Sequence, residues 1–379
     1  MKGNLKDHKF ILFVVDHYNP LGMARSLGEE GILPIVILHS DHPMLFNHCS
    51  YVQKLHIVST VQEGYDLLLH EYGKEQFKPF VLTANDDITM FLDLHYNELI
   101  DKFYFFNGGG QAVISYYMNK EAIGDVAVEC GIDKPRGEVL NRGEVPKTLR
   151  YPVLTKVLKS TEGAWKDDVF ICQYENELIE AYKKIKANQL LVQEYIIKKN
   201  ELCVDGISIN QGEEIWAPWT SEYIRFTSKG YGHYMWIKPY ADEIKEKIQN
   251  ILKKTRYSGI FSLECLIDEN DNLFFLEVNF RNSTWSYAYT FGGLNLPYQW
   301  AKATLKGHID YNSTQIRTQP FTAMNEIGDL REGVLTKQVG FFKWVKQLKK
   351  CDVLYLYNKK DKAPFYYSLL GKALNRLHL

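Results

Sequence analysis

The residues between Gly259 and Arg281 combine two carboxylates, an amide and a guanidinium in a pattern that fits divalent-metal chemistry. Glu277, Asn279 and Arg281 alternate with apolar residues, so on a β-strand they project from one face. A turn-rich stretch, Asp268–Asn272, separates this run from an earlier apolar run. The sequence therefore predicts a β-hairpin with polar groups gathered on one side.

A loop of Glu269–Asn272 would place Glu264 directly opposite Glu277 in this hairpin. Two opposed carboxylates about 5 Å apart destabilise each other unless a cation lies between them. We expect Glu264, Glu277 and Asn279 to bind Mg²⁺, or Mn²⁺ in its place, because these ions take oxygen ligands and share them with phosphates. Arg281 adds a fixed cation for a phosphoryl or carboxylate oxygen. The alternative is a solvent-facing strand that is polar on one side.

Lys156 ends the apolar run Tyr151–Lys156, which has the composition of a strand. An ammonium group without a partner is costly in apolar surroundings. An anionic ligand would compensate its charge, so Lys156 joins the candidate site residues.

An open α/β domain is predicted over residues 1–110. Helical patterns separate the strand-like runs, and this alternation is typical of a parallel sheet. Ligands of such sheets lie beyond the carboxyl ends of the strands, which makes Asp16–Gly22 and Asn85–Asp87 candidate substrate contacts. Ordinary turn and helix-cap chemistry is the alternative. The predicted strands are Phe10–Val15, Pro34–His39 and Phe80–Ala84, and a turn is predicted at Asn19–Gly22 after the first of them.

The triple glycine Gly108–Gly110 marks the start of a second region, in which strands and helices alternate less regularly. We expect four segments: residues 1–110, 111–195, 196–310 and 311–379. The predicted class is α/β, with α+β character in the C-terminal part. Further predicted helices are Asn119–Cys130, Asn176–Ala187, Ala241–Lys254 and Asn295–Lys306, and further predicted strands are Pro152–Leu158, Val169–Gln173, Leu190–Ile197, Leu202–Ile209 and Glu214–Pro218.

With these motifs in order along the chain, the sequence resembles an ATP-grasp ligase from about Asn119 to Leu305. The resemblance implies an ATP-grasp fold preceded by the parallel-sheet domain, with ATP and Mg²⁺ as cofactors. It implies that Lys120 and Lys156 contact nucleotide phosphates and that Glu201 binds the ribose. The segment that contains Glu194, Tyr195 and Ile196 would read the adenine through its backbone, and Glu264 with the Glu277–Arg281 pentapeptide matches the magnesium motif.

The same resemblance implies an ATP-dependent carboxylate–amine ligase. The γ-phosphoryl group would move to a carboxylate, an amine would attack the acyl phosphate, and ADP and phosphate would leave. Lys156 and Arg281 would act by stabilising charge on the transferred group. Asn19–Ser26 resembles the start of D-aspartate ligase and of carbamoyl-phosphate-synthase-like ligases, which indicates an amino-acid or cell-envelope substrate. The loop Ser160–Trp165, which would cover the phosphates, has one glycine where many relatives have several.

Several further residues are weaker candidates for the site. Arg225, Lys229 and His233 could line an acceptor pocket, although a lone histidine is more often a packing residue. The aromatic residues Trp285, Tyr287 and Tyr289 either shape the substrate site or belong to the core. None of the scattered cysteines forms a C-x-x-C pair, so we expect reduced thiols and no cysteine catalysis.

The composition limits the class of protein, its partners and its location. A chain of 379 residues with 45% hydrophobic and 24% charged residues predicts a folded protein of more than one domain. The net charge of -1 gives no field that would recruit nucleic acid. We expect small-molecule substrates, and a cytoplasmic location because neither a signal-like nor a membrane-spanning run is present. The alternative function is that of a nucleotide-binding regulatory or scaffold protein with the same fold.

The C-terminal tail is basic. From Gly333 onward ten lysines and arginines face two aspartates, a net charge of +8, which leaves -9 for the rest of the chain. A solvated basic face is the ordinary interpretation. The alternative is peripheral contact with a membrane, as in an envelope-assembly factor, through the helical apolar pattern of Leu369, Leu370, Ala373, Leu374 and Leu377.

Overall fold

A computed structural model describes residues 4–158, 169–228, 230–240 and 242–376, the last of these as backbone only beyond Leu369. The predicted loop Ser160–Trp165 and the candidate Lys229 lie outside the described residues, as do the side chains of Leu370, Ala373, Leu374 and Leu377. The chain divides into two compact units. Unit 1 consists of Met1–Ile114, Cys203–Ser262 and Asn279–Leu379, and unit 2 of Ser115–Leu202 and Leu263–Val278.

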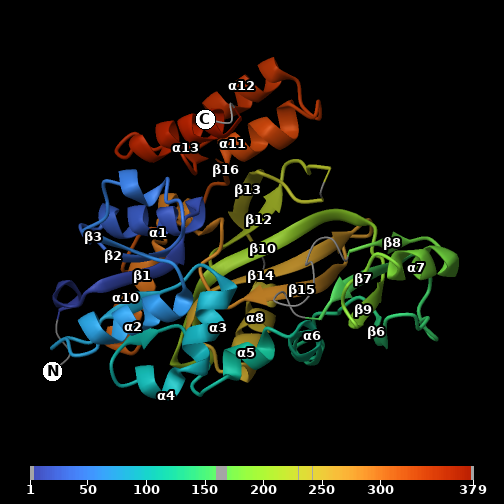
Figure 1. Cartoon of the computed structure of the whole chain (residues 1–379), viewed down its shortest axis with the longest axis horizontal. Coiled ribbons are helices and arrows are strands. Elements are labelled where there is room, and N and C mark those ends of the chain that lie inside the picture. The colour runs from blue at the N-terminus through green and yellow to red at the C-terminus, as the bar shows by residue number, and fades with distance from the viewer. Residues whose placement is uncertain (1–3, 159–168, 229, 241, 377–379) are drawn as a thin grey trace. The chain divides into compact units, whose positions relative to one another are not determined.

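Unit 1 begins with a parallel sheet in the order β3-β2-β1-β4-β5, of which Figure 1 labels β1, β2 and β3. This sheet confirms the expected α/β class. We did not predict β3, because at this sheet edge only Val58 is buried and the strand lacks a continuous apolar run. The strands are β1 (Phe10–Val15), β2 (Ile35–His39), β3 (Lys54–Val58), β4 (Phe80–Leu82) and β5 (Tyr104–Phe105), and the helices between them are α1 (Tyr18–Glu29), α2 (Val61–Tyr72), α3 (Asp86–Leu94) and α4 (Tyr96–Leu99).

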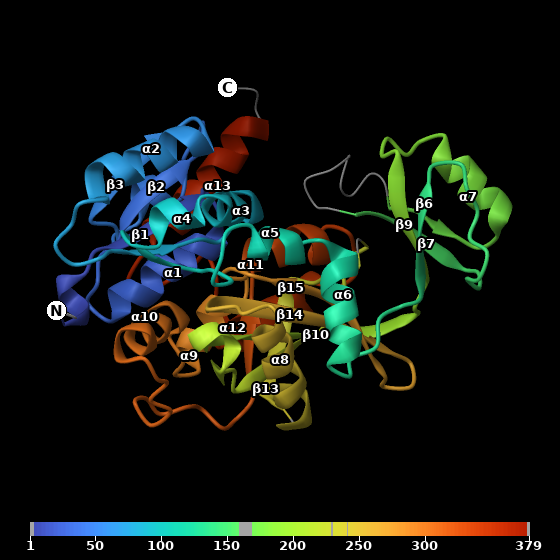
Figure 2. The same cartoon turned by 90° about the horizontal axis from the view of Figure 1, so that it is seen from below.

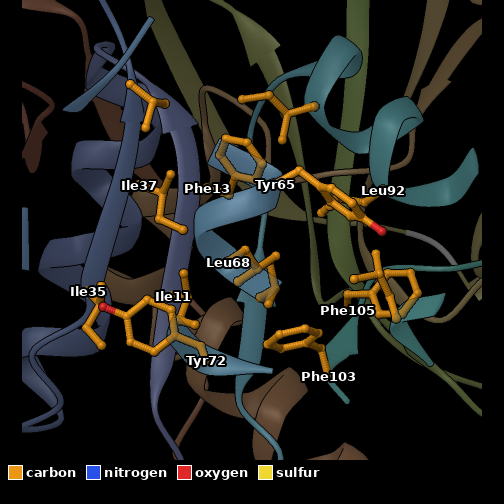
Figure 3. Packing of buried hydrophobic residues seen from close by; sticks show 14 residues of the cluster. Ile11, Phe13, Ile35, Ile37, Tyr65, Leu68, Tyr72, Leu92, Phe103 and Phe105 are labelled. Carbon is orange, nitrogen blue, oxygen red and sulfur yellow. The ribbon is translucent and has the colours of Figure 1, made fainter. Parts of the chain in front are cut away.

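One face of this sheet packs on α2 and α3 to form an apolar core (Figure 3). Alternate strand residues such as Ile11 and Phe13 point into it, as the two-residue period of a strand requires. Tyr65 and Leu68 of α2 meet them from the helix side, at the spacing of one helical turn. The core fixes the strands, and hence the loops that leave their carboxyl ends.

Helix α1 corrects one expectation. We predicted a turn at Asn19–Gly22, yet these residues form the first turns of α1. The His17 ring caps the helix by accepting the Asn19 N–H at 3.3 Å, and Pro20 lies in the first turn, where a missing N–H costs nothing. A Cβ at Gly22 would come within 2.8 Å of the Tyr287 side chain, so close helix packing explains this glycine.

A second sheet has the order β15-β14-β10-β12-β13-β16-β17, with β11 paired to β10. The predicted strands Leu202–Ile209 and Glu214–Pro218 correspond to β10 and β11, which pair as an antiparallel hairpin, and Asn210 and Gln211 turn the chain with positive φ angles. Its strands are β10 (Lys198–Ile209), β11 (Glu214–Trp216), β12 (Trp219–Tyr223), β13 (Tyr234–Pro239), β14 (Gly259–Asp268), β15 (Leu273–Asn279), β16 (Phe321–Met324) and β17 (Val353–Leu354). The helices in this part of the chain are α8 (Asp242–Lys254), α9 (Ser286–Phe291) and α10 (Leu296–Lys306).

Unit 2 contains a smaller antiparallel sheet in the order β6-β9-β7-β8, with α7 beside it (Figure 2). Leu178 and Tyr182 of α7 pack on Val153 and Val192 of the sheet to form a core. The elements are α5 (Val113–Tyr117), α6 (Lys120–Glu129), β6 (Gly137–Asn141), β7 (Val153–Val157), β8 (Ile171–Cys172), α7 (Glu175–Tyr182) and β9 (Gln189–Glu194).

The C-terminal residues are an integral part of unit 1. Arg25 of α1 is fully buried, and its guanidinium donates to Asp361 Oδ2 at 2.9 Å and to the carbonyl oxygens of Tyr355 and Leu356. The elements are α11 (Glu326–Asp329), η4 (Leu330–Val334), α12 (Phe341–Lys350) and α13 (Ala363–Arg376). Within the described ranges, no helix combines the length and apolar character that crossing a membrane requires.

Candidate functional site

Four of the predicted site residues converge in unit 2. Lys120 is the first residue of α6, Lys156 lies on β7, Glu201 on β10 and Glu277 on β15. Lys120 Nζ is 3.6 Å from Glu277 Oε2, and Lys120, Glu277 and Glu201 all act electrostatically on Lys156. Asn119 starts α6 by accepting the backbone N–H groups of the first turn, which sets the position of Lys120. The structure thus brings together two lysines and two carboxylates from separate segments.

Lys156 is the electrostatic centre of this cluster. Burial, reinforced by the neighbouring charge of Lys120, lowers the pKa of Lys156 from 10.5 to about 8, against the opposing effects of Glu277, Glu201 and Glu121. The nearby carboxylates therefore compensate the ammonium only in part. An anionic ligand beside Lys156 would raise its pKa again. We expected such a ligand from the sequence, for a lysine in an apolar strand.

Glu201 is held in place by a neighbouring lysine that the sequence interpretation did not single out. Lys198 Nζ donates to Glu201 Oε1 at 2.6 Å, and only 13% of the Glu201 side chain is exposed. Burial raises the pKa of Glu201, and Glu277 raises it further, while Lys198 and Lys156 lower it. The carboxylate is thus oriented before any ligand binds.

The predicted adenine-reading segment follows β9. The Glu194 carboxylate pairs with Arg136 and accepts the Arg150 N–H at 2.9 Å, so its side chain has a structural role. The Glu194 and Tyr195 N–H groups donate to the carbonyl oxygens of Arg136 and Pro152. Among the backbone hydrogen bonds of the described residues, none involves the Ile196 N–H.

The predicted metal ligands lie on the hairpin of β14 and β15. Glu264 is half-buried on β14, whereas Glu277 and Asn279 both lie on β15. The connecting loop is Glu269–Asn272, as we expected, and Asp268 N–H donates to Asn272 O at 3.1 Å where the two strands meet it. The direct opposition of Glu264 and Glu277 stays a prediction.

No group of three or more His, Cys, Asp or Glu side chains within the described residues has the geometry to hold a metal ion. The predicted set has two carboxylates and relies on the Asn279 amide for its third ligand. Asn279 Oδ1 accepts from Arg281 Nη2 at 2.9 Å. The assignment of Glu264, Glu277 and Asn279 to a metal therefore rests on the chemistry of their oxygen atoms.

In unit 1, Arg281 pairs with the helix that follows β4. Its Nε donates to Asp86 Oδ1 at 2.7 Å and its Nη2 to Asp86 Oδ2 at 3.1 Å. Asn282 Nδ2 donates to Asn19 Oδ1 at 2.6 Å, and Asn19 Nδ2 returns a bond to the Asn282 carbonyl at 3.0 Å. Asn19 and Asp86 were candidate substrate contacts, and the structure places both against the segment that follows β15.

Asp205 contacts the segment that follows β15, and it was not singled out from the sequence. It is fully buried, and burial raises its pKa to about 6, although hydrogen bonds from Ser283, Ser262 and Ser286 oppose the shift. Ser283 Oγ donates to Asp205 Oδ1. A lone aspartate within the apolar run Leu202–Ile209 was the available signal.

Several weaker candidates have structural roles instead. Asp16 accepts the backbone N–H groups of Met44, Leu45 and Phe46, Asn85 caps α3, and Asp87 is exposed. These contacts are the cap and turn chemistry that was the alternative interpretation.

Arg225 and His233 are also engaged within the fold. Arg225 Nε donates to Asp329 Oδ1 at 3.0 Å, and His233 Nε2 lies 3.2 Å from Glu332 Oε2. Burial lowers the pKa of His233. Trp285 and Tyr289 are buried, and Tyr287 OH donates to Glu29. These contacts favour the packing alternative for the histidine and the aromatic residues.

No known protein-family model matches the chain. Its structure is similar to that of N5-carboxyaminoimidazole synthetase from Staphylococcus aureus, with a TM-score of 0.67, 16% identity, and coverage of 88% of this chain and 86% of that chain. It is also similar to an L-amino acid ligase from Bacillus licheniformis, with a TM-score of 0.60, 14% identity, and coverage of 79% and 74%.

A third similar structure is the biotin carboxylase domain of 2-oxoglutarate carboxylase from Hydrogenobacter thermophilus, determined with MgADP, ADP and bicarbonate. Its TM-score is 0.61, with 16% identity and coverage of 82% of this chain and 73% of that chain. Similarity at identities this low establishes only the fold. The activity has to be argued from the residues of the site. The chain has the ATP-grasp fold that its motifs predicted.

Proposed function

We propose that the protein is an ATP-dependent carboxylate–amine ligase that forms an amide or peptide bond through an acyl phosphate. The observation that carries this proposal is the convergence of Lys120, Lys156, Glu201 and Glu277 within unit 2. These residues were selected by motif and spacing, and they come from four separate elements. A polyanion that also carries a divalent cation fits such a cluster of partly compensated lysines beside carboxylates.

Lys120 and Lys156 would bind the phosphate oxygens of ATP. The depressed pKa of Lys156 supports this role, because a phosphate beside it would stabilise its charged form. Glu264, Glu277 and Asn279 would hold Mg²⁺, with Mn²⁺ as a substitute, through oxygen atoms. When bound, the metal would neutralise charge on the transferred phosphoryl group.

The nucleoside would be recognised by the segment after β9 and the start of β10. The Ile196 N–H would donate to an acceptor on the adenine ring, and Glu194 and Tyr195 fix the backbone beside it. Glu201, oriented by Lys198, would accept hydrogen bonds from the ribose hydroxyls. The choice of ATP over GTP rests on the resemblance to ATP-grasp ligases and on the similar structures that contain ADP.

The reaction would proceed in two displacements. A substrate carboxylate oxygen attacks the γ-phosphorus of ATP, the bond to the β-phosphate oxygen breaks, and ADP leaves. An amine then attacks the acyl carbon, phosphate leaves with the electrons of the C–O bond, and the amine loses a proton. No side-chain nucleophile is required, so the chain contributes position and charge.

Arg281 would stabilise charge that develops on the transferred group or the substrate carboxylate. Its planar guanidinium is held by Asp86 on one side and by the Asn279 amide on another. This bidentate pairing fixes its orientation before substrate binds, which is the condition for effective electrostatic stabilisation. Asn19 and Asp86 remain candidate contacts for a small-molecule substrate.

The similar structures bear on the substrate class. One of them is named as an L-amino acid ligase, which agrees with the amino-acid or cell-envelope substrate that the N-terminal motif indicated. We propose such a substrate, a cytoplasmic location and the four-segment division predicted above. Carboxylation is the alternative use of an acyl phosphate, because another similar structure was determined with bicarbonate.

Phosphate release with Mg²⁺ and ATP, measured over a panel of carboxylates and amines, tests the proposal. Release that needs both a carboxylate and an amine, with mass-spectrometric detection of the amide, supports the ligase. Bicarbonate in place of the carboxylate supports carboxylation if it alone sustains release. ATP binding without release on any member of a broad panel favours the regulatory or scaffold function.

A further inference from the structure

Helix α12 presents a basic face that also carries exposed aromatic side chains. Phe341, Phe342, Lys343, Lys346, Lys349 and Lys350 are all exposed, and we call these six residues the α12 outer face. Phe342 is 88% exposed and Phe341 is 54% exposed. Two adjacent exposed phenylalanine rings form a contiguous apolar patch, and such a patch with a polar rim is typical of an interaction surface.

The opposite side of α12 is anchored to unit 1. Trp344 is buried, and its Nε1 donates to Asp329 Oδ2 at 2.9 Å. Gln347 Oε1 accepts from Arg225 Nη1 at 2.7 Å, and Arg225 is itself paired with Asp329. The helix belongs to the C-terminal group drawn in red in Figure 1. This anchoring fixes which side of the helix faces outward.

The charge of the α12 outer face is of one sign. Lys343, Lys346 and Lys350 follow one another at helical spacing, and the sequence from Gly333 to Cys351 contains no aspartate or glutamate. In the part of the chain that the structure describes, none of the four lysines forms an ion pair. The face therefore offers its positive charge to a partner outside the chain.

We propose that the α12 outer face docks the protein on an anionic lipid bilayer. The lysines would lie at the headgroup phosphates, while Phe341 and Phe342 at the start of the helix enter the boundary with the acyl chains. A bilayer receives both kinds of side chain in one contact. A nucleic-acid duplex would take the lysines but offers no apolar region for the two rings.

The sequence indicated a different membrane candidate, the apolar pattern of α13. Of its residues the structure describes only the Leu369 side chain, which is 39% exposed, so that expectation stays a prediction. The α12 outer face needs no rearrangement of the fold. Removing the tail would leave the buried Arg25 without its partners Tyr355, Leu356 and Asp361, so point substitutions test the proposal better than truncation.

The test is cosedimentation of the full chain with vesicles of equal parts phosphatidylcholine and phosphatidylserine, against vesicles of phosphatidylcholine alone. We expect binding to the anionic vesicles that weakens as salt is added. Each lysine near an anionic surface strengthens binding about fivefold, so Lys343→Ser with Lys346→Ser should weaken it by at least about tenfold. Phe342→Ser should weaken binding at high salt, where the electrostatic part is screened.

Matched controls distinguish binding through the α12 outer face from a general effect of exposed lysines or apolar side chains. Lys74→Ser with Lys184→Ser removes two exposed lysines elsewhere, and Leu33→Ser removes another exposed apolar side chain. These variants should bind like the wild type, and all variants should keep the wild-type circular dichroism and phosphate release. The proposal is overturned if anionic vesicles do not bind the protein at low salt or if the face and control variants bind alike. It is also overturned if the α12 variants abolish a dimer or RNA binding while vesicle binding is absent.

Discussion

Replacing Lys156 with methionine should stabilise the protein while it abolishes ATP turnover. The pKa of this buried ammonium falls from 10.5 to about 8 in the folded protein. Each pKa unit corresponds to about 1.4 kcal/mol, so the charged form is disfavoured by folding by about 3 kcal/mol. Methionine has a similar length and no charge, and the free energy of unfolding at pH 7 should rise by roughly this amount.

The pH dependence of this stability difference follows from the direction of the Lys156 pKa shift. Below pH 8 both the folded and unfolded states carry the proton, and the full penalty is present. Between pH 8 and 10.5 the unfolded state binds more protons than the folded state, so the wild-type protein gains stability as the pH rises. The advantage of Lys156→Met should therefore shrink over this interval.

Urea unfolding of the wild type and the variant, followed by circular dichroism at several pH values, measures this difference. Lys134→Met is the matched control in the same unit, because Lys134 pairs with Glu121 and Asp125 and its pKa is raised. We expect this control to lower the urea midpoint and Lys156→Met to raise it. MgATP should stabilise the wild type and lose that effect in Lys156→Met. A fall in the midpoint of Lys156→Met, or full turnover by it, would refute the reasoning.

Three further substitutions test other parts of the account. Glu277→Ala should abolish Mg²⁺-dependent phosphate release with unchanged circular dichroism, and wild-type release would remove Glu277 from the site. Arg281→Lys should lower the rate at least about tenfold, because a point charge cannot replace the planar fork, and an unaltered rate would remove Arg281 from the mechanism. Asp361→Asn should lower the free energy of unfolding by about 3–5 kcal/mol, because it leaves the buried Arg25 charge unpaired. The control is Asp310→Asn, which breaks the surface pair with Lys306 and should change the free energy of unfolding by less than about 1 kcal/mol. Equal effects of Asp361→Asn and Asp310→Asn would contradict the role given to burial.

The elements that carry a clear hydrophobic period were predictable from the sequence. Strand β1 and helix α10 end within a residue of the expected bounds, because apolar runs and an Asn cap mark them. Strand β3 was missed because His56 interrupts its apolar residues and only Val58 of this edge strand is buried. The start of α1 was misjudged because Asn, Pro and Gly signal both turns and first helical turns.

The convergence of Lys120, Lys156, Glu201 and Glu277 was predictable from motif order, since each residue belongs to a motif of the ATP-grasp resemblance. Their supporting contacts were not predictable. The pairs that orient Glu201 and Arg281 join residues by tertiary contact, and single-sequence spacing carries no information on such partners. The direct opposition of Glu264 and Glu277 across the hairpin stays a prediction, because spacing alone does not reveal a loop residue with positive φ such as Asp271.

The central claim is that this chain couples ATP cleavage to the joining of a carboxylate and an amine. The most direct measurement is phosphate release with Mg²⁺ and ATP across amino acids, dipeptides and sugar acids, with the product identified by mass spectrometry and Glu277→Ala as the control. The account predicts release that requires both substrates, one amide formed for each phosphate, and neither with the variant. Phosphate release without an amide product, or equal release by wild type and Glu277→Ala, would contradict it.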